Sequence, residues 1–217
     1  MNKYNNHDGL NKSNCRTLMI DSIRNSTTKK NKILSLPAEY FEIEKTLWDK
    51  VSKKFNYVLV ERDLETYKRL NRNINKSVKQ GRCFTNKLPI TYNGNIGDII
   101  FDSYPNEYSH IILDYCGQYP TFYKEISHIF KNDIVEKGGT ISMTFNKRIS
   151  GKYNMNFINK IDKLYTYQIP DFDEFTKTMR TLELFLLKEC GYKYNIETIF
   201  EYYDKNSMVL VIVRRIK

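Results

Sequence analysis

The sequence has 217 residues, 41% of them hydrophobic, with a formal net charge of +10 and an isoelectric point near 9.3. This length fits one large domain that buries a substantial core. No apolar run approaches the ~20 residues that span a bilayer, so we expect no membrane span. The charge favours an anionic partner such as nucleic acid. Alternatively, a composition rich in Lys, Asn, Ile and Tyr reflects A+T-rich coding and raises the isoelectric point without any selection for binding.

Cysteine and histidine usage argues against a metal site. The sequence holds four cysteines and three histidines, with no C-x-x-C pair. This scatter does not predict a structural zinc site, and reduced cysteines fit a cytoplasmic protein. The polar N-terminal segment lacks the apolar stretch of a signal peptide. We therefore expect a cytoplasmic protein without a bound metal.

The chain divides by composition into a polar, basic arm at residues 1–31 and an α/β domain at residues 32–217. Apolar residues from Leu18 to Ile23 predict one short helix within the arm. We expect a frayed tail with this helix docked on the domain. The alternative is a basic arm that contacts a phosphate backbone.

Strands and helices are predicted to alternate through the domain. Residues 32–36 form the first strand, which Pro37 ends, and a helix follows over about 38–55. Residues 56–60 form the second strand, and residues 64–78 form a helix with a basic outer side. The remaining expected elements, in order, are a turn-rich segment at 81–94, strands near 98–101 and at 110–114, a helix that Pro120 opens, a strand at 140–145, a basic insertion at 146–170, a long helix capped by Asp171 or Asp173 and stopped by Gly191, and strands at 195–203 and 208–216.

This order predicts the fold class. Strand–helix alternation indicates a doubly wound, mostly parallel sheet. The last two strands are joined by four residues, 204–207. Such a short link predicts an antiparallel hairpin. We therefore expect an α/β fold with a seven-stranded sheet that closes with a C-terminal antiparallel hairpin.

The strand at 110–114 leads into the strongest candidate site. Its short apolar run is typical of a strand buried on both faces, and such sheets bind ligands beyond the carboxyl ends of their strands. Asp114 and Tyr115 stand at that position as candidate catalytic residues. Cys116 is either a nucleophile or, as we favour, a small buried residue. Lys147 and Arg148 end the next strand on the same rim and are candidates for binding a substrate phosphate.

Residues 30–217 resemble a class I (Rossmann-like) S-adenosylmethionine-dependent methyltransferase. The resemblance rests mainly on the seven strands with a closing antiparallel hairpin, and also on acids at strand ends such as Asp114. The resemblance implies S-adenosylmethionine as cofactor. It also implies that Glu61, with Asp63 as the alternative, binds the ribose hydroxyls, and that Asp98 meets the adenine amine. Residues Leu36, Pro37 and Ala38 would form the cofactor turn. That turn is glycine-rich in the family, and residues 36–40 contain no glycine.

The stretch from Asp114 to Gly117 occupies the position of the family's Asp/Asn-Pro-Pro-Tyr/Phe motif, here without the prolines. In nucleic-acid amino-methyltransferases the acid accepts hydrogen bonds from the target amine, and the aromatic ring stacks on the flipped base. The resemblance therefore favours a methyltransferase that acts on a DNA or RNA base. One alternative is a degenerate fold relative that serves as a basic nucleic-acid-binding or protein-interaction module. The other is a small-molecule methyltransferase.

Overall fold

The computed structural model describes residues 8–51, 55–115, 117–147, 155–157, 159, 174–204 and 206–217. Its strands are β1 (Lys32–Ser35), β2 (Asn56–Glu61), β3 (Ile90–Asn93), β4 (Tyr108–Asp114), β5 (Val135–Asn146), β6 (Tyr194–Asp204) and β7 (Asn206–Arg215). Its helices are α1 (Asp8–Arg24), α2 (Glu42–Lys50), α3 (Leu64–Lys79), α4 (Ile96–Phe101), the short 3-10 helix η1 (Tyr119–Phe122), α5 (Tyr123–Lys131) and α7 (Glu174–Cys190).

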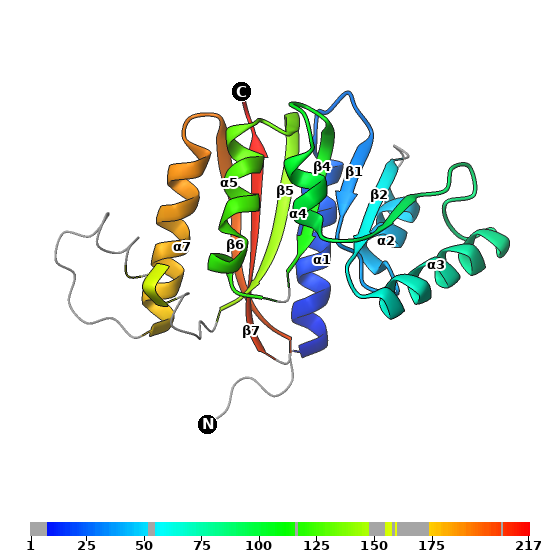
Figure 1. Ribbon diagram of the computed structural model, residues 1–217, viewed down its shortest axis with the longest axis horizontal. Coiled ribbons are helices and arrows are strands. Elements are labelled where there is room, and N and C mark those ends of the chain that lie inside the picture. Colours follow the sequence, from blue (N-terminus) through cyan, green and yellow to red (C-terminus); the bar gives the residue numbers. More distant parts are fainter. Residues whose placement is uncertain are drawn as a thin grey trace.

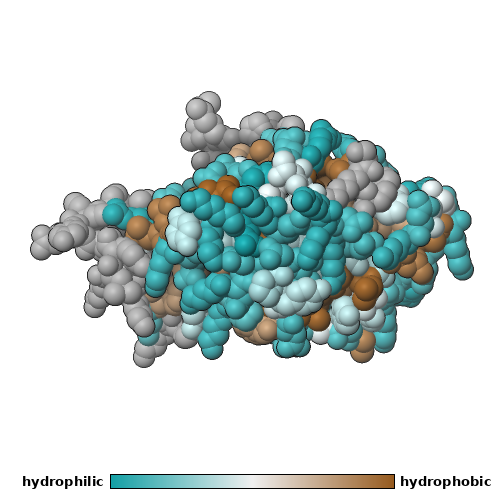
Figure 2. All heavy atoms as spheres, turned by 90° about the horizontal axis from the view of Figure 1, so that it is seen from above, coloured by the Kyte–Doolittle hydropathy of each residue, from teal (hydrophilic) through white to brown (hydrophobic). Residues whose placement is uncertain are grey.

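All seven strands form one sheet in the order β3-β2-β1-β4-β5-β7-β6 (Figure 1). Strands β1 to β5 pair in parallel, whereas β7 is antiparallel to both β5 and β6. The predicted fold class is therefore confirmed, including the closing hairpin. The carboxyl ends of the parallel strands point to the lower edge of Figure 1, and Figure 2 views the opposite edge, which is largely hydrophilic.

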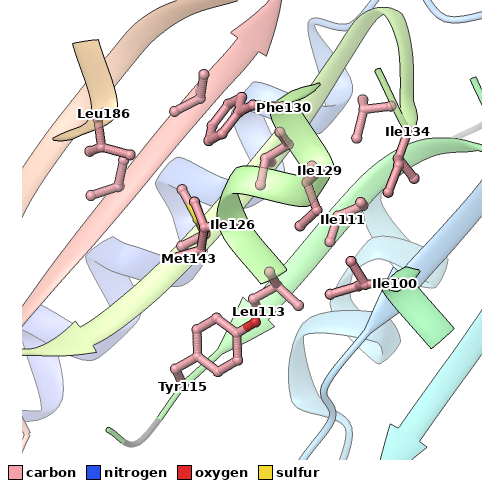
Figure 3. Packing of buried hydrophobic residues seen from close by; sticks show 14 of the residues in the cluster. Ile100, Ile111, Leu113, Tyr115, Ile126, Ile129, Phe130, Ile134, Met143 and Leu186 are labelled. Atoms are coloured by element: carbon pink, nitrogen blue, oxygen red, sulfur yellow. The ribbon is translucent and has the colours of Figure 1, made fainter. Parts of the chain in front are cut away.

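Helices cover both faces of the sheet, and strand residues alternate between the two cores. Ile111 of β4 packs with α4, α5 and α7, as Figure 3 shows, whereas its neighbour Ile112 packs with α1, α2 and α3. Both side chains are fully buried. Burial on both faces explains why the central strands appear in the sequence as continuous apolar runs rather than as alternating ones.

The third strand was predicted in the wrong place. Residues 98–101 lie in helix α4, and the strand is β3, at residues 90–93. The side chain of Asn95 caps α4 by accepting a hydrogen bond from the Gly97 amide at 3.2 Å. An apolar run of four residues fits a buried strand and a short helix equally well. β3 itself is a largely exposed edge strand of four residues, so it lacks the continuous apolar run of the buried strands.

Two other predicted boundaries are corrected. The helix expected over residues 38–55 begins only at Glu42 and ends at Lys50. Strand β5 begins at Val135 and includes Gly138 and Gly139, whereas the strand was expected only from residue 140. A Cβ atom at Gly139 would lie 2.1 Å from the Ser109 carbonyl oxygen, so this glycine lets β5 approach β4 closely.

The C-terminal elements agree with their prediction. Helix α7 ends at Cys190, and Gly191 follows with a φ of +50°, the left-handed conformation that stops a helix. Strands β6 and β7 then form the expected hairpin. Both proposed caps of α7, Asp171 and Asp173, lie outside the described residues, as does most of the 146–170 insertion.

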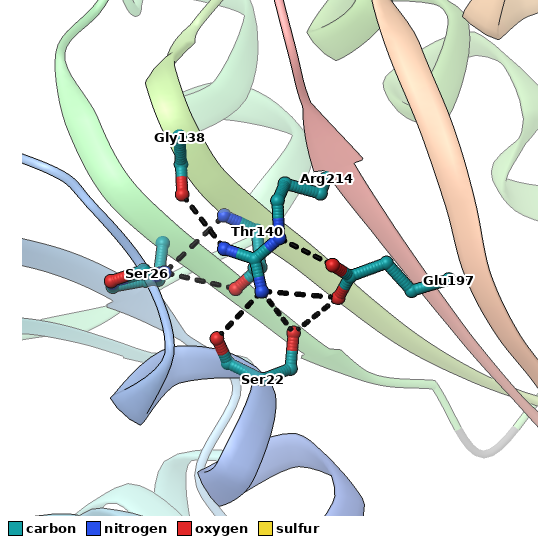
Figure 4. A network of polar contacts seen from close by, with 7 residues as sticks. Ser22, Ser26, Gly138, Thr140, Glu197 and Arg214 are labelled. Carbon is teal, nitrogen blue, oxygen red and sulfur yellow. Dashed lines mark hydrogen bonds and ion pairs between the residues drawn. The ribbon is translucent and has the colours of Figure 1, made fainter.

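The helix expected near the N-terminus is present and is longer than predicted. Helix α1 spans 17 residues and buries Met19, Ile20 and Ile23 against the sheet. The guanidinium group of Arg214 in β7 holds α1 against the sheet through hydrogen bonds. This group donates to the Ser22 carbonyl at 2.9 Å, to the Gly138 carbonyl at 2.9 Å and to the Glu197 carboxylate (Figure 4).

We predict that Arg214→Ala lowers the free energy of unfolding by about 2–3 kcal/mol, because it removes the ion-pair partner of Glu197 and the donor to two carbonyl groups, and leaves only the Ser22 hydroxyl on that carboxylate. Only 17% of the Arg214 side chain is exposed. Urea denaturation measures the change. Arg24→Ala is the matched control, because half of the Arg24 side chain is exposed in its ion pair with Asp21. The control should cost less than ~1 kcal/mol. Equal losses would contradict the role of Arg214.

Candidate functional site

A cavity of about 220 Å³ opens at the carboxyl ends of β1, β4 and β5. The loop after β1 contributes Leu36, Pro37 and Ala38 to its lining, β4 contributes Asp114, and β5 contributes Thr144. The position follows from the topology. The chain continues from β1 to β2 on one side and from β4 to β5 on the other, so the connections after the neighbouring strands β1 and β4 run in opposite directions. Ligand sites in open α/β sheets lie at such switch points.

Asp114 is half-buried at the end of β4, where the sequence placed it. The Thr144 hydroxyl donates a hydrogen bond to its carboxylate, and these two residues face each other in the β4–β5 register. The sequence analysis did not single out Thr144. Its signal is its position in the strand next to β4, two residues before the polar end of that strand at Asn146. The hydroxyl holds the Asp114 carboxylate in one orientation at the cavity wall.

Helix α1 forms one wall of this cavity, which the sequence analysis missed. Lys12, Cys15, Arg16 and Met19 line it, at the end of α1 that lies near the lower edge of Figure 1. Burial, and secondarily the negative charge of Asp114, raise the pKa of the Cys15 thiol to about 12. Cys15 therefore stays protonated at neutral pH and acts as a packing residue. The sequence signal was the four-residue spacing of Cys15, Met19 and Ile23, which predicts one buried helix side.

The loop after β1 is held by backbone bonds rather than by glycines. The Leu36 amide donates to the Ile112 carbonyl at 3.0 Å, and the Phe41 amide donates to the Ala38 carbonyl at 3.0 Å. Phe41 is 1% exposed and has a φ of +39°, in the left-handed region. A buried aromatic residue thus takes the turn conformation that glycine adopts most easily. The loop lines the cavity and leaves it open.

Glu44 of α2 lies beneath this loop and is 2% exposed. Its carboxylate accepts a hydrogen bond from the Ser35 hydroxyl. Burial raises the pKa of Glu44 above its ordinary value and outweighs the lowering effect of that hydrogen bond. A buried carboxyl group beside the cavity therefore tends to hold its proton.

Glu61 is the last residue of β2 and is half-buried. Its carboxylate accepts a hydrogen bond from the Asp63 amide at 2.8 Å. Asp63, the alternative acid, caps α3 by accepting from the Thr66 amide at 2.8 Å, and hydrogen bonds from Thr66 lower its pKa. Since Asp63 is committed to the helix, Glu61 is the acid at this strand tip that remains for a ligand. Neither residue lines the 220 Å³ cavity.

Asp98 stands apart from the other candidates. It is exposed in the first turn of α4 and does not line the cavity. The residues at the carboxyl end of β3 are instead Asn93 and Asn95. The Asn93 amide group donates to the Glu61 carbonyl at 2.9 Å, which ties the ends of β3 and β2 together. Asp98 was named from the resemblance to the methyltransferase family, and its role stays a prediction.

Tyr115 is not available to stack on a base as it stands. It is 3% exposed, and its ring stacks on Phe122 at a centroid distance of 3.8 Å and an interplanar angle of 8°. Figure 3 shows it within the core beside Leu113. Burial raises the pKa of its hydroxyl, which has no hydrogen-bond partner among the described residues. The structure therefore makes Tyr115 a core residue behind the site.

The basic rim residues are partly described. The Lys147 ammonium group forms an ion pair with Glu201, and its amide donates to the Ser207 carbonyl at 2.8 Å, so this lysine is committed to the β6–β7 hairpin. Arg148 and Cys116 lie outside the described residues. Across the described part of the chain, no cluster of three or more His, Cys, Asp or Glu side chains is placed to hold a metal ion. No helix there is long and apolar enough to cross a membrane.

The raised pKa of Glu44 predicts a pH dependence of stability. The folded state keeps a proton that the unfolded chain releases above about pH 4.3, so Glu44 lowers stability as the pH rises from there through its folded pKa. Glu44→Gln should be more stable than the wild type near pH ~7.5, with a smaller gain near pH ~4.5. Chemical denaturation at both pH values measures this. Glu42→Gln, on the exposed side of α2, should show no such trend.

No family model matches the sequence, and no curated protein matches it. Solved structures do match. An O-methyltransferase from Bacillus cereus, in complex with SAH, has a TM-score of 0.56 at 12% identity over 100% of this chain and 84% of that one. The O-methyltransferase TomG from Streptomyces achromogenes, with SAM, has a TM-score of 0.57 at 12% identity over 94% and 80%. A candidate rRNA methylase from Clostridium thermocellum has a TM-score of 0.56 at 8% identity over 93% and 95%.

At sequence identities this low, the structural matches establish the shared architecture alone. They agree with the observed strand order and with the antiparallel β7 between β5 and β6. The chain has the Rossmann-like fold of the class I S-adenosylmethionine-dependent methyltransferases.

Proposed function

We propose that this chain is an S-adenosylmethionine-dependent methyltransferase that acts on a base of a nucleic acid. One observation carries the proposal. The cavity at the switch point brings the loop after β1 together with Asp114, an acid whose carboxylate Thr144 orients. Similar folds in the Bacillus cereus and Streptomyces achromogenes enzymes were solved with SAH and SAM, which supports the same cofactor here.

The described residues fit this cofactor in part. Glu61 offers a carboxylate for the ribose hydroxyls, and Leu36, Pro37 and Ala38 would lie against the cofactor at the end of β1. At the adenine position we favour Asn95 over Asp98, because Asn95 directly follows the end of β3. The cavity is smaller than the ~300 Å³ at the low end of ligand sites, so it would hold one part of the ligand while the rest extends along the strand ends.

In the mechanism the cofactor supplies an activated methyl group, and the protein supplies alignment. The Asp114 carboxylate, held by the Thr144 hydroxyl, accepts a hydrogen bond from the acceptor amine and draws its proton away as the nitrogen attacks. Met19 and Phe41 place apolar surface beside the acid and limit the access of water. Tyr115 supports this site from behind, through its stack on Phe122.

Charge supports nucleic acid as the substrate class. The net charge of +10 favours a polyanion, and one similar structure is a candidate rRNA methylase. Two of the similar structures are O-methyltransferases, so a small-molecule acceptor is the competing substrate class. The loop after β1, which lacks glycine, favours a second candidate function: a fold relative that binds nucleic acid without a cofactor.

We predict that S-adenosylmethionine and S-adenosylhomocysteine each raise the melting temperature of this protein. At ~100 times the dissociation constant the stabilisation is about 2.7 kcal/mol, which corresponds to roughly 5–10 °C for a chain of this size. Glu61→Ala should abolish this shift, because it removes the carboxylate offered to the ribose.

Asp63→Asn is the matched control for that experiment, because asparagine still caps α3. It removes one negative charge two residues from Glu61 and should keep the shift in melting temperature. If neither ligand stabilises the wild type, the methyltransferase proposal fails and the cofactor-free candidate replaces it. If Glu61→Ala keeps the shift, Glu61 has no role in binding the cofactor.

We also predict that Asp114→Asn lowers kcat for methyl transfer by roughly 10²–10⁴-fold, the usual contribution of a positioned acid or base. The thermal shift with S-adenosylmethionine should remain, because Asp114 faces the acceptor. Thr144→Val should lower kcat less, since it only frees the carboxylate to rotate. Transfer of a tritiated methyl group to RNA, DNA and mixed small amines measures these rates. Full activity in Asp114→Asn would exclude Asp114 from catalysis.

A further inference from the structure

A second positively charged surface lies outside the candidate site, on helix α3 and the segment after it. It consists of Arg72, Lys76, Lys79 and Arg82, which we call the α3 basic patch. Each of these residues is exposed. Spacings of four and three residues place Arg72, Lys76 and Lys79 on one side of the helix. The patch therefore presents several cations in a row rather than isolated charges.

Among the described residues, the cations of α3 outside the patch form ion pairs, and the cations of the patch form none. Arg69 forms an ion pair with Glu39, and Lys68 forms one with Glu65 at 2.8 Å. Within the described part of the chain, no carboxylate lies within ion-pair distance of the four patch cations. Their charge is therefore available to an external anion.

The surface around the patch is hollowed on both sides of Lys76 and Gln80. A hollow of about 430 Å³ is lined by Arg72, Asn75, Lys76, Lys79 and Gln80, all of them polar. A cavity of about 540 Å³ lies between α2 and α3, and Lys45, Lys76 and Arg82 line it together with Asp49 and Tyr40. Arginine, lysine, asparagine and glutamine side chains are the usual donors to phosphate oxygens.

Tyr40 connects this surface to the candidate site. It lines both the 540 Å³ cavity and the 220 Å³ cavity at Asp114. Its side chain is 56% exposed, although tyrosine has a large apolar ring. Proteins that bind single strands combine a basic groove along the backbone with aromatic rings on which bases stack. Tyr40 thus lies between the cavity at Asp114 and the 540 Å³ cavity, which in turn shares Lys76 and Gln80 with the hollow at the patch.

We infer that the α3 basic patch binds the phosphodiester backbone of a single-stranded nucleic acid whose target base enters the cavity at Asp114. This inference rests on the proposed function for the position of the target base, and on the patch itself for the binding. An acidic protein is the less suitable partner. Protein interfaces centre on apolar and aromatic side chains, and the 430 Å³ hollow has none in its lining.

The test is fluorescence anisotropy with ~20-nucleotide single-stranded RNA and DNA of one sequence, longer than the usual 4–16-nucleotide site. The variant is the triple Arg72→Gln, Lys76→Gln, Lys79→Gln. The matched control is Lys124→Gln, Lys131→Gln, Lys137→Gln, which removes the same charge from exposed lysines that lie in α5 and β5. Thermal melting confirms that both proteins are folded.

We expect the patch variant to lose roughly 5-fold in affinity per cation near 0.1 M salt, or about 100-fold in total. Its slope of log affinity against log salt should fall by about 2, from ~0.7 per lost phosphate contact. The control should lose less than about 5-fold. Tyr40→Ala should weaken binding more than Tyr40→Phe does, because phenylalanine keeps the ring.

Several outcomes overturn the inference. One is that the wild type binds neither strand at low salt, another is that the patch and control variants lose affinity equally, and a third is that polyglutamate of equal charge competes as well as RNA does. The thermal shift with S-adenosylmethionine is measured in parallel on the same proteins. Loss of strand binding in the patch variant supports the inference even where that shift is absent and the proposed methyl transfer fails.

Discussion

The position of β1 in the sheet determines where chemistry can occur in this protein. β1 has only four residues, yet it pairs with β2 on one side and β4 on the other, and its residues Ile33 and Leu34 are fully buried in opposite cores. The loops that follow β1 and β4 therefore run in opposite directions. They leave a space between them at the carboxyl ends of these two strands. The loop after β1, Asp114 and Thr144 meet at that space.

Helix α1, which precedes the first strand, forms one wall of the same space. The Arg214 network fixes the later part of the helix to β5, β6 and β7, and this leaves its earlier turns above the strand ends. The end of the helix that lines the cavity is thus held in place through contacts at the other end of the helix. It brings apolar surface to Asp114 and keeps Cys15 protonated. Because α1 contributes both to these contacts and to the cavity lining, we expect a substitution at Arg214 to affect the cavity as well as the stability.

Much of the fold could be predicted from the sequence because the central strands are buried on both faces and the helices carry regular apolar stripes. β3 could not be predicted, because this short, exposed edge strand lacks the continuous apolar run of the buried strands. The apolar run at residues 98–101 was predicted to be the strand, although it lies in a helix. In the candidate site, Asp114 and Glu61 were predicted from their positions at strand ends, and their roles stay predictions. Thr144 and Cys15 were missed because their roles come from pairing across strands and from packing of distant segments. The burial of Tyr115 could not be predicted, because only the fold shows that Phe122 covers its ring.

The central claim is that the cofactor binds at the carboxyl ends of β1, β2 and β4. Ultraviolet photolabelling with tritiated S-adenosylmethionine, followed by tryptic peptide mapping, tests it directly. The account predicts label on the peptides 33–45, 55–62 or 88–124, which carry the loop after β1, Glu61 and Asp114. Excess unlabelled S-adenosylhomocysteine should suppress that label. Absence of label, or label confined to the α3 peptides 73–76, 77–79 and 80–82, would contradict the account.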